Sequence, residues 1–285
     1  MGRVVFLNGE FLPPEEAKIS IFDRAVNFGD AVYEVAGVLD GKLVDFEHHM
    51  QRYRGSLEKL EMESPLDAAQ ILQAFRRLVE LNDLDEGLVY MQVTRGVAER
   101  DFDWPADIEP TVLMFTQPKS AGESTASEAG IRLASTPDIR WARRDIKTVN
   151  LLGQVLAKHA AHEAGADEAL MIDADGYVTE CGSMSFFIID GDSVRTRPLE
   201  GNHILPGITR RAVIALCESK GLELVETRFT LEQALAADEA FVTAASAYVM
   251  PAVNIDGQTI ADGKPGPLTR RLQEIYLDYA RQSLI

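Results

Sequence analysis

The sequence predicts a mixed α/β (α+β) protein of two domains, and three observations carry this prediction. The chain has 285 residues, more than one simple core usually holds. Alternating strand patterns and longer helical patterns follow one another along it. A polar stretch without periodicity, residues 117–130, separates two such halves. We therefore expect a smaller N-terminal α/β domain over residues 1–118, a linker over 119–128 and a larger C-terminal domain over 129–285.

Two hairpins and two helices are expected in the N-terminal half. Asn8-Gly9 and Asp40-Gly41 each stand between apolar runs, which is a strong hairpin signal. The strands that these turns join are Val4–Leu7, Glu10–Leu12, Ala31–Leu39 and Lys42–Phe46. Apolar residues at three- and four-residue spacing predict the helices, and short apolar runs predict two buried strands. These elements are, in chain order, His48–Leu60, Asp67–Asn82, Gly87–Thr94 and Pro110–Thr116.

Strands and helices alternate in the C-terminal half. The expected strands are Ile131–Thr136, Ala169–Ile172, Tyr177–Glu180, Met184–Ile189, Ser193–Arg197, Leu224–Thr227 and Glu239–Ala244. The expected helices are Val149–Glu163, Thr209–Lys220 and Pro267–Ala280. Gly221 follows the second helix as a C-cap. Hairpins in both halves favour antiparallel strand pairing.

Charge and cysteine content narrow the possible partners and compartment. The formal net charge is −17, from 28 basic and 45 acidic residues, which argues against a nucleic-acid or membrane partner. No stretch has transmembrane length, and the N-terminal apolar run is too short for a signal peptide. Cys181 and Cys217 form no disulfide framework. We expect a cytoplasmic protein.

An amine, a carboxylate and a glycine-led helix start follow one another in the C-terminal half. Lys147 stands just before a predicted helix, and Glu180 ends a predicted strand. Gly207 precedes Thr209 where another helix begins. Pyridoxal 5′-phosphate (PLP) needs such a set: an amine for its aldehyde, a carboxylate for its ring nitrogen and N–H groups for its phosphate. Taken singly, these residues are at least as typical of a surface lysine, a solvated glutamate and a threonine N-cap.

Three further side chains are candidates for binding anions. Arg52, on a predicted helix, could donate a charge-assisted hydrogen bond to a phosphate. Tyr33, on a predicted strand, and Arg100, in a loop, could bind a substrate carboxylate. The alternative interpretation is that Arg52 and Arg100 are solvated arginines and that Tyr33 is a structural tyrosine of its strand. The histidines lack metal-site spacing, so we expect no metal.

Taken together, these residues resemble the fold-type IV PLP-dependent aminotransferases, and among them most closely the D-amino acid (D-alanine) transaminases. The resemblance covers nearly the whole chain. Its motifs are FDRAVNFGDAVYE at residues 22–34, DIKTVNLLG at residues 145–153 and GIT at residues 207–209. The family relationship implies two domains with the cofactor cleft between them, and a homodimer.

The resemblance also implies a role for each site residue. Lys147 would hold the cofactor as a Schiff base and move a proton at its C4′ atom. Glu180 would pair with the pyridine nitrogen, and Leu205 would pack on one face of the ring. The phosphate contacts would come from Arg52, Ile208, Thr209, Ala245 and Ser246. Tyr33 and Arg100 would bind the substrate carboxylate.

Two positions depart from the pattern of the D-amino acid transaminases. Phe102 stands where a third carboxylate-binding residue, a histidine, is expected, and Ala245 stands where a threonine is expected. The predicted reaction is transamination between D-amino acids and 2-oxo acids, for example D-alanine plus 2-oxoglutarate giving pyruvate plus D-glutamate. The alternatives are a branched-chain L-amino acid aminotransferase, a lyase such as aminodeoxychorismate lyase, and a non-catalytic binding protein.

Overall fold

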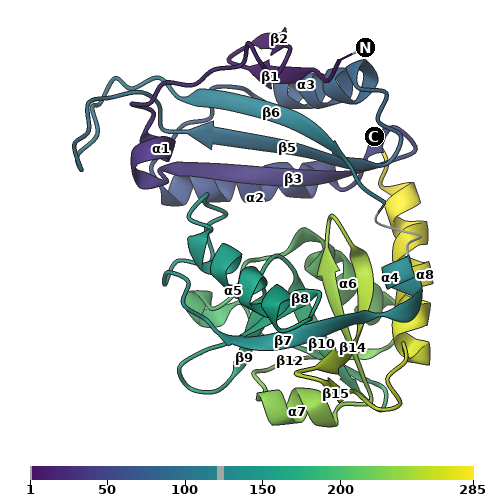
Figure 1. Cartoon of the computed structure of the whole chain (residues 1–285). Coiled ribbons are helices and arrows are strands. Elements are labelled where there is room, and N and C mark those ends of the chain that lie inside the picture. Colours follow the sequence, from purple (N-terminus) through teal and green to yellow (C-terminus); the bar gives the residue numbers. More distant parts are fainter. Residues whose placement is uncertain (1, 121–124) are drawn as a thin grey trace. The chain divides into compact units, whose positions relative to one another are not determined.

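The computed structural model describes residues 2–120 and 125–285. The chain forms two compact units (Figure 1). The first contains residues 1–119, 146–150 and 281–285, and the second contains the rest of the chain. Part of the predicted linker, residues 121–124, lies outside the described residues. The predicted domain boundaries therefore stay a prediction.

An antiparallel sheet forms the centre of the first unit. Its strand order is β2-β1-β6-β5-β3-β4, and all its pairs run antiparallel. The strands are β1 (Val5–Leu7), β2 (Glu10–Leu12), β3 (Ala31–Leu39), β4 (Lys42–Leu43), β5 (Gly87–Thr94) and β6 (Thr111–Pro118). Both predicted hairpins are confirmed, as β1–β2 and β3–β4.

Helices α2 (Phe46–Lys59) and α3 (Ala68–Leu81) cover one face of this sheet (Figure 1). α3 begins at a capping box in which Asp67 and Gln70 satisfy each other's backbone N–H groups. The predicted strand Lys42–Phe46 is too long, because Asp45 turns the chain at φ 55° and Phe46 begins α2. A short helix that the periodicity did not indicate, α1 (Arg24–Phe28), precedes β3.

Residues 146–150 run along the outer edge of β3. The N–H of Tyr33 donates to the carbonyl of Lys147 over 2.9 Å, and Val32 forms an antiparallel bridge with Thr148. The predicted helix Val149–Glu163 therefore starts later than expected, as α5 (Leu152–Glu163), because β3 holds this stretch extended. This edge pairing fixes the backbone of Lys147 to the sheet.

The second unit contains a mixed nine-stranded sheet. Its order is β12-β11-β10-β13-β14-β7-β8-β9, with β15 paired to β14. The strands are β7 (Ile131–Pro137), β8 (Glu168–Ile172), β9 (Val178–Cys181), β10 (Ser185–Asp190), β11 (Ser193–Thr196), β12 (Glu223–Glu226), β13 (Glu239–Ala244), β14 (Tyr248–Ile255) and β15 (Gln258–Thr259). The expected hairpins are confirmed. β7 adds parallel pairs with β8 and β14, and β11 pairs in parallel with β12.

The helices of the second unit include the three that the sequence predicts in the C-terminal half. Over its described residues, the helical segments are α4 (Thr125–Ala129), α5 (Leu152–Glu163), η1 (Glu200–Asn202), α6 (Ile208–Ser219), α7 (Leu231–Ala236) and α8 (Pro267–Gln282). The last two residues of α8 lie in the first unit. Over the described residues, no helix has both the length and the apolar composition needed to cross a bilayer.

Candidate functional site

Lys147 is held by its backbone, while its amine lies over an aromatic ring. Its N–H donates to the Oγ of Ser56 on α2 over 3.2 Å, and its carbonyl accepts from β3. The Nζ atom lies 4.1 Å from the centre of the Tyr33 ring. The backbone of Lys147 is thus anchored at the edge of the sheet, and the residue is half-buried.

Tyr33 is the first of three stacked rings across the sheet. It stacks on Tyr90 of β5 at 5.5 Å between ring centres, and Tyr90 stacks on Phe115 of β6 at 4.6 Å. Burial raises the pKa of Tyr90 far above its usual value, so its hydroxyl stays protonated and donates to Gln92. The stack restrains the ring that lies beneath the Lys147 amine.

Arg52 is bound by a buried carboxylate on the helix-covered face of the sheet. Glu34 accepts from Nε and Nη2 of Arg52 over 2.8 and 2.7 Å, and from Nδ1 of His49 over 2.9 Å. Burial raises the pKa of Glu34, but the Arg52 guanidinium outweighs burial and lowers it to about 2. Burial lowers the pKa of His49, which leaves its imidazole neutral at pH 7.

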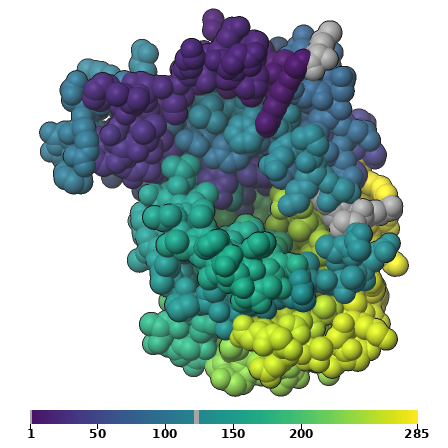
Figure 2. All heavy atoms as spheres, in the orientation of Figure 1, coloured from purple at the N-terminus to yellow at the C-terminus, as the bar shows by residue number. Residues whose placement is uncertain are grey.

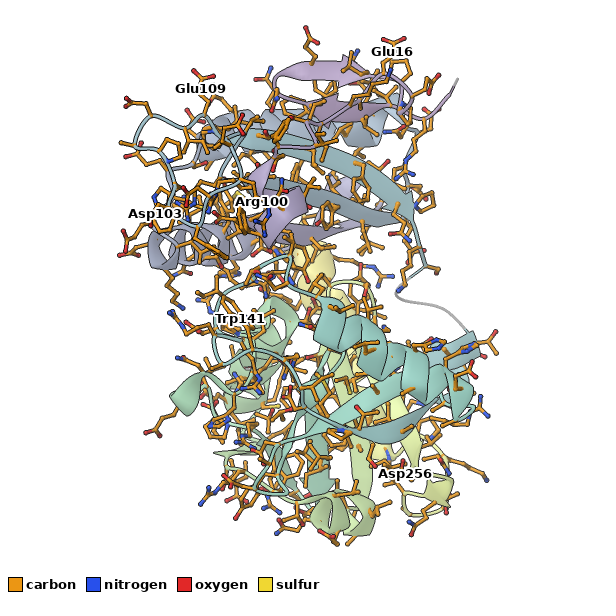
Figure 3. The ribbon with its side chains drawn as sticks, turned by 60° about the vertical axis from the view of Figure 1, so that its left-hand side comes forward. Glu16, Arg100, Asp103, Glu109, Trp141 and Asp256 are labelled. Atoms are coloured by element: carbon orange, nitrogen blue, oxygen red, sulfur yellow. The ribbon has the colours of Figure 1, made fainter. Side chains whose placement is uncertain are left out.

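Arg100 lies in the connection between β5 and β6. This connection projects beyond the strand ends and forms a lobe of the first unit (Figures 1 and 2). Figure 3 shows Arg100 beside α1, and its guanidinium carbon lies 5.4 Å from the ring centre of Phe28. The side chain is exposed. Phe102, at the position of the expected histidine, is 79% exposed.

Glu180 lies buried at the end of β9, where two donors meet its Oε1 atom. One is the guanidinium of Arg140, and the other is the N–H of Leu205, at 3.0 Å. Arg140 also donates to both carboxylate oxygens of Asp138, over 2.9 and 2.8 Å. The hydroxyl of Thr179 donates to Asp138 over 2.8 Å. Glu180 therefore belongs to a buried charge network.

The two carboxylates of this network have opposite pKa shifts. Burial raises the pKa of Glu180, and the attraction of Arg140 only partly offsets that effect. Burial acts in the same direction on Asp138, but there Arg140, Thr179 and Arg144 outweigh it and lower the pKa. Glu180 is thus the more easily protonated of the two carboxylates.

The N-terminus of α6 has no side-chain cap. Gly207 is its N-cap and provides no side-chain oxygen to the first N–H groups. A Cβ atom on Gly207 would lie 2.8 Å from Oγ of Ser185, so a larger residue would fill this space. Ile208 and Thr209 are the first two helical residues, and both are buried. Thr209 is therefore not the N-cap.

A tight turn, residues 245–247, joins β13 and β14. It includes Ala245 and Ser246, which are partly exposed. Thr243, just before it on β13, pairs directly with Ser185 on β10. The Oγ1 atom of Thr243 is buried and has no hydrogen-bond partner among the residues that the structure describes. A buried hydroxyl without a partner is costly, so its presence fits a polar ligand at this end of the strands.

The predicted residues fall into two groups, one in each unit. The first unit brings Lys147 and Tyr33 together and also contains Arg52 and Arg100. The second brings Glu180 and Leu205 together. The other residues of the second group are Ile208, Thr209, Ala245 and Ser246.

The residues that hold these side chains were not predicted. Glu34 binds Arg52 and Arg140 binds Glu180, while His49 and Asp138 bind Glu34 and Arg140 in turn. Of these residues, Glu34 could have been recognised from the sequence, because it interrupts the apolar positions on the helix-facing side of β3. Asp138 and Arg140 lie in a loop after β7, where periodicity says nothing about contacts.

Comparisons with known proteins show the family to which the chain belongs. The family model of class IV amino-transferases matches residues 31–255. A D-alanine aminotransferase of Staphylococcus aureus is 38% identical over 96% of this chain and 97% of its own length. The branched-chain amino acid aminotransferase of Escherichia coli superposes with a TM-score of 0.92 at 25% identity, covering 98% of this chain and 95% of that one. The branched-chain enzyme of Thermobaculum terrenum, solved in its PLP form, gives 0.86 at 25% identity, covering 100% and 98%.

The family match covers most of the chain, and the identity to the staphylococcal enzyme extends over nearly its full length. The agreement in fold extends over both units, since the superpositions cover almost every residue. This chain is a class IV amino-transferase.

Proposed function

We propose that this protein is a PLP-dependent transaminase that exchanges amino groups between D-amino acids and 2-oxo acids, with D-alanine and 2-oxoglutarate as one substrate pair. The observation that carries the proposal is the 38% identity to a D-alanine aminotransferase over 96% of the chain. The two branched-chain enzymes share the fold at 25% identity. Class IV membership therefore supports the chemistry, and the nearer relatives support the D-amino acid.

The side chains present fit the cofactor. Glu180 is a buried carboxylate whose pKa is raised, and α6 begins without a side-chain cap. Thr243 adds a buried hydroxyl without a partner. PLP, when bound, supplies an electron sink for the bonds at the amino acid's α-carbon. We propose that Glu180 contacts its ring nitrogen and that Leu205 packs on the ring. The proposed phosphate contacts are Arg52, Ile208, Thr209, Ala245 and Ser246.

Lys147 is the proposed catalytic residue, because it combines a fixed backbone with an amine that lies over the Tyr33 ring. Two hydrogen bonds to β3 and α2 hold its main chain. Its side chain stays free to move a proton between the substrate α-carbon and the C4′ position. The Tyr33 ring, 4.1 Å from Nζ, limits the directions that the amine can take. We propose that Tyr33 and Arg100 bind the substrate carboxylate.

A half-reaction assay tests the proposed substrate. The purified holoenzyme is mixed with D-alanine or with L-leucine, each without an acceptor, and the absorbance of the bound cofactor is followed. At limiting substrate concentration, we expect the half-reaction with D-alanine to be at least about tenfold faster than with L-leucine. The reason is that the two amino acids have opposite configurations at the α-carbon, so their α-hydrogens point to opposite sides. Faster reaction with L-leucine would support the branched-chain alternative. In a separate assay without an acceptor, catalytic release of pyruvate from aminodeoxychorismate would support the lyase alternative.

We further propose that the protein is a cytoplasmic homodimer with amino acids and 2-oxo acids as its small-molecule partners. Its two cysteines are free and buried, which suits a reducing compartment. On α5, Leu152, Val155 and Leu156 are 69, 58 and 48% exposed, at helical spacing on one side. An apolar stripe of this kind on an acidic protein favours contact with a second copy.

Leu156→Asp tests that face. A carboxylate in an apolar contact between copies loses its water, so we expect the dimer to dissociate to monomers at micromolar concentration. Light scattering after size-exclusion chromatography measures the mass. Leu199→Asp, at a leucine outside α5 that is 42% exposed, serves as the control and should remain dimeric. A Leu156→Asp protein that stays dimeric would contradict the placement of the interface.

A further inference from the structure

Two arginines and two phenylalanines of the first unit lie next to one another, with cations and rings alternating in the order Arg24, Phe28, Arg100 and Phe102. The guanidinium of Arg24 lies 4.6 Å from the ring centre of Phe28, and that of Arg100 lies 5.4 Å from the same ring. Arg100 is also 6.0 Å from the ring of Phe102, and the two rings are 5.7 Å apart. The guanidinium of Arg100 thus contacts two aromatic rings, Phe28 on α1 and Phe102 on its own loop.

The loop that carries Phe102 is fixed through its backbone. Arg24 is 3% exposed and donates to the carbonyls of Asp101, Phe102 and Asp103, over 2.7, 3.2 and 3.3 Å. Its Nε donates to Asp30 over 2.8 Å. A buried arginine with all these bonds orders the loop whatever side chain stands at position 102. The side chain of Phe102 is therefore not needed to fold the loop.

Phe102 needs a different explanation, because a phenylalanine that is 79% exposed contributes little to a core. Most of its ring is exposed to water, and its aromatic and cationic neighbours are the ring of Phe28 and the guanidinium of Arg100. Arginine beside an aromatic ring retains its N–H groups for hydrogen bonds, because the ring contacts its flat face. A ring at this position can thus orient Arg100 without competing for its donors.

We propose that Phe102, together with Phe28, is a positioning residue that holds the Arg100 guanidinium ready for the substrate carboxylate. The inference rests on the proposed function, in which Arg100 binds that carboxylate. A histidine at position 102 would donate its own hydrogen bond to the substrate carboxylate. In this chain, Phe102 instead orders the arginine that binds the carboxylate. Carboxylate binding then depends on one cation whose rotamers are restricted before the substrate arrives.

The test measures KM and kcat of the holoenzyme for D-alanine, or for whichever amino acid the wild type uses best. Phe102→Leu keeps an apolar side chain but removes the ring, and we expect KM to rise about two- to fivefold, the factor expected from an exposed cation–π contact. We expect kcat to change by less than about twofold, since the reacting groups are untouched. Phe102→Tyr retains the ring and should keep the wild-type KM.

Two further variants separate the possible outcomes. Phe22→Leu changes another exposed phenylalanine of the same unit, 45% exposed, and should leave KM unchanged. Arg100→Met removes the charge-assisted bonds and should raise KM about 10- to 100-fold. A wild-type KM in Phe102→Leu, with a raised KM in Arg100→Met, would overturn the positioning role alone. A wild-type KM in Arg100→Met would overturn both that role and the assignment of Arg100. Wild-type enzyme inactive with D-amino acids would contradict the proposed function, while the KM series still tests Phe102.

Discussion

Lys147→Ala should remove transaminase activity, with kcat reduced by at least about 100-fold, the lower range of what a positioned acid–base group supplies. The same change should leave the fold intact. The backbone bonds of residue 147 to Tyr33 and Ser56 do not involve its side chain. We also expect the variant to lose its cofactor during gel filtration, because it can no longer be held covalently. Visible absorbance and turnover measure the two effects.

Lys42→Ala is the matched control for this prediction. Lys42 is an exposed lysine on β4 of the same unit, so its loss should alter neither absorbance nor turnover. Circular dichroism of both variants checks that the fold is retained. Activity of Lys147→Ala close to that of the wild type would refute the assignment of the catalytic lysine.

Glu34→Gln should lower the free energy of unfolding by about 3–5 kcal/mol, which is the cost of removing one of the two charges from a buried ion pair. Glu34 is fully buried, and the side chain of Arg52 is 9% exposed. The neutral amide cannot balance the guanidinium that remains beside it. Urea denaturation of the wild type and the variant measures the difference.

An exposed ion pair of the same unit provides the contrast. Arg77 and Glu80 pair on α3 with side chains that are 48 and 70% exposed. Water screens these charges, so Glu80→Gln should cost less than about 1 kcal/mol. If both glutamine variants lost the same stability, burial would not be the cause of the effect at Glu34.

Glu34 also predicts how stability depends on pH. Its pKa in the folded protein, about 2, is below its ordinary value of 4.5, because Arg52 stabilises the carboxylate. The unfolded chain therefore takes up a proton at higher pH than the folded one. The contribution of Glu34 is complete above pH 4.5 and is lost as the pH falls from there through about 2. Over this range Glu34→Gln should have a flatter stability profile than the wild type.

The sequence predicted most secondary structure because it depends on local patterns. The hairpin turns and the periodicity of α2, α3 and α6 are recognisable within a dozen residues. β14 was missed because Pro251 stands in its middle, and proline ordinarily argues against an interior strand. Pairing with β13 and β7 overrides that local preference. The start of α5 was misplaced for a related reason, since β3 holds the preceding residues extended.

For the candidate site too, some features could be predicted from the sequence, and others depend on tertiary contacts. Lys147, Glu180 and the helix start at Gly207 were predicted as site features from the sequence alone, because the prediction needed only their types and their order along the chain. Only the folded chain shows which charges they meet. Arg140 reaches Glu180 from 40 residues away.

Glu34 and Arg52 show the same limit of sequence reasoning. Both lie in the N-terminal half, yet nothing in the spacing says that the arginine on α2 would meet the carboxylate on β3. A buried charge is stable only beside its counterion, and the choice of counterion depends on which strands and helices become neighbours. Residue identity and order were therefore fixed by the sequence, whereas the partners that set each group's charge and orientation were decided by the tertiary structure.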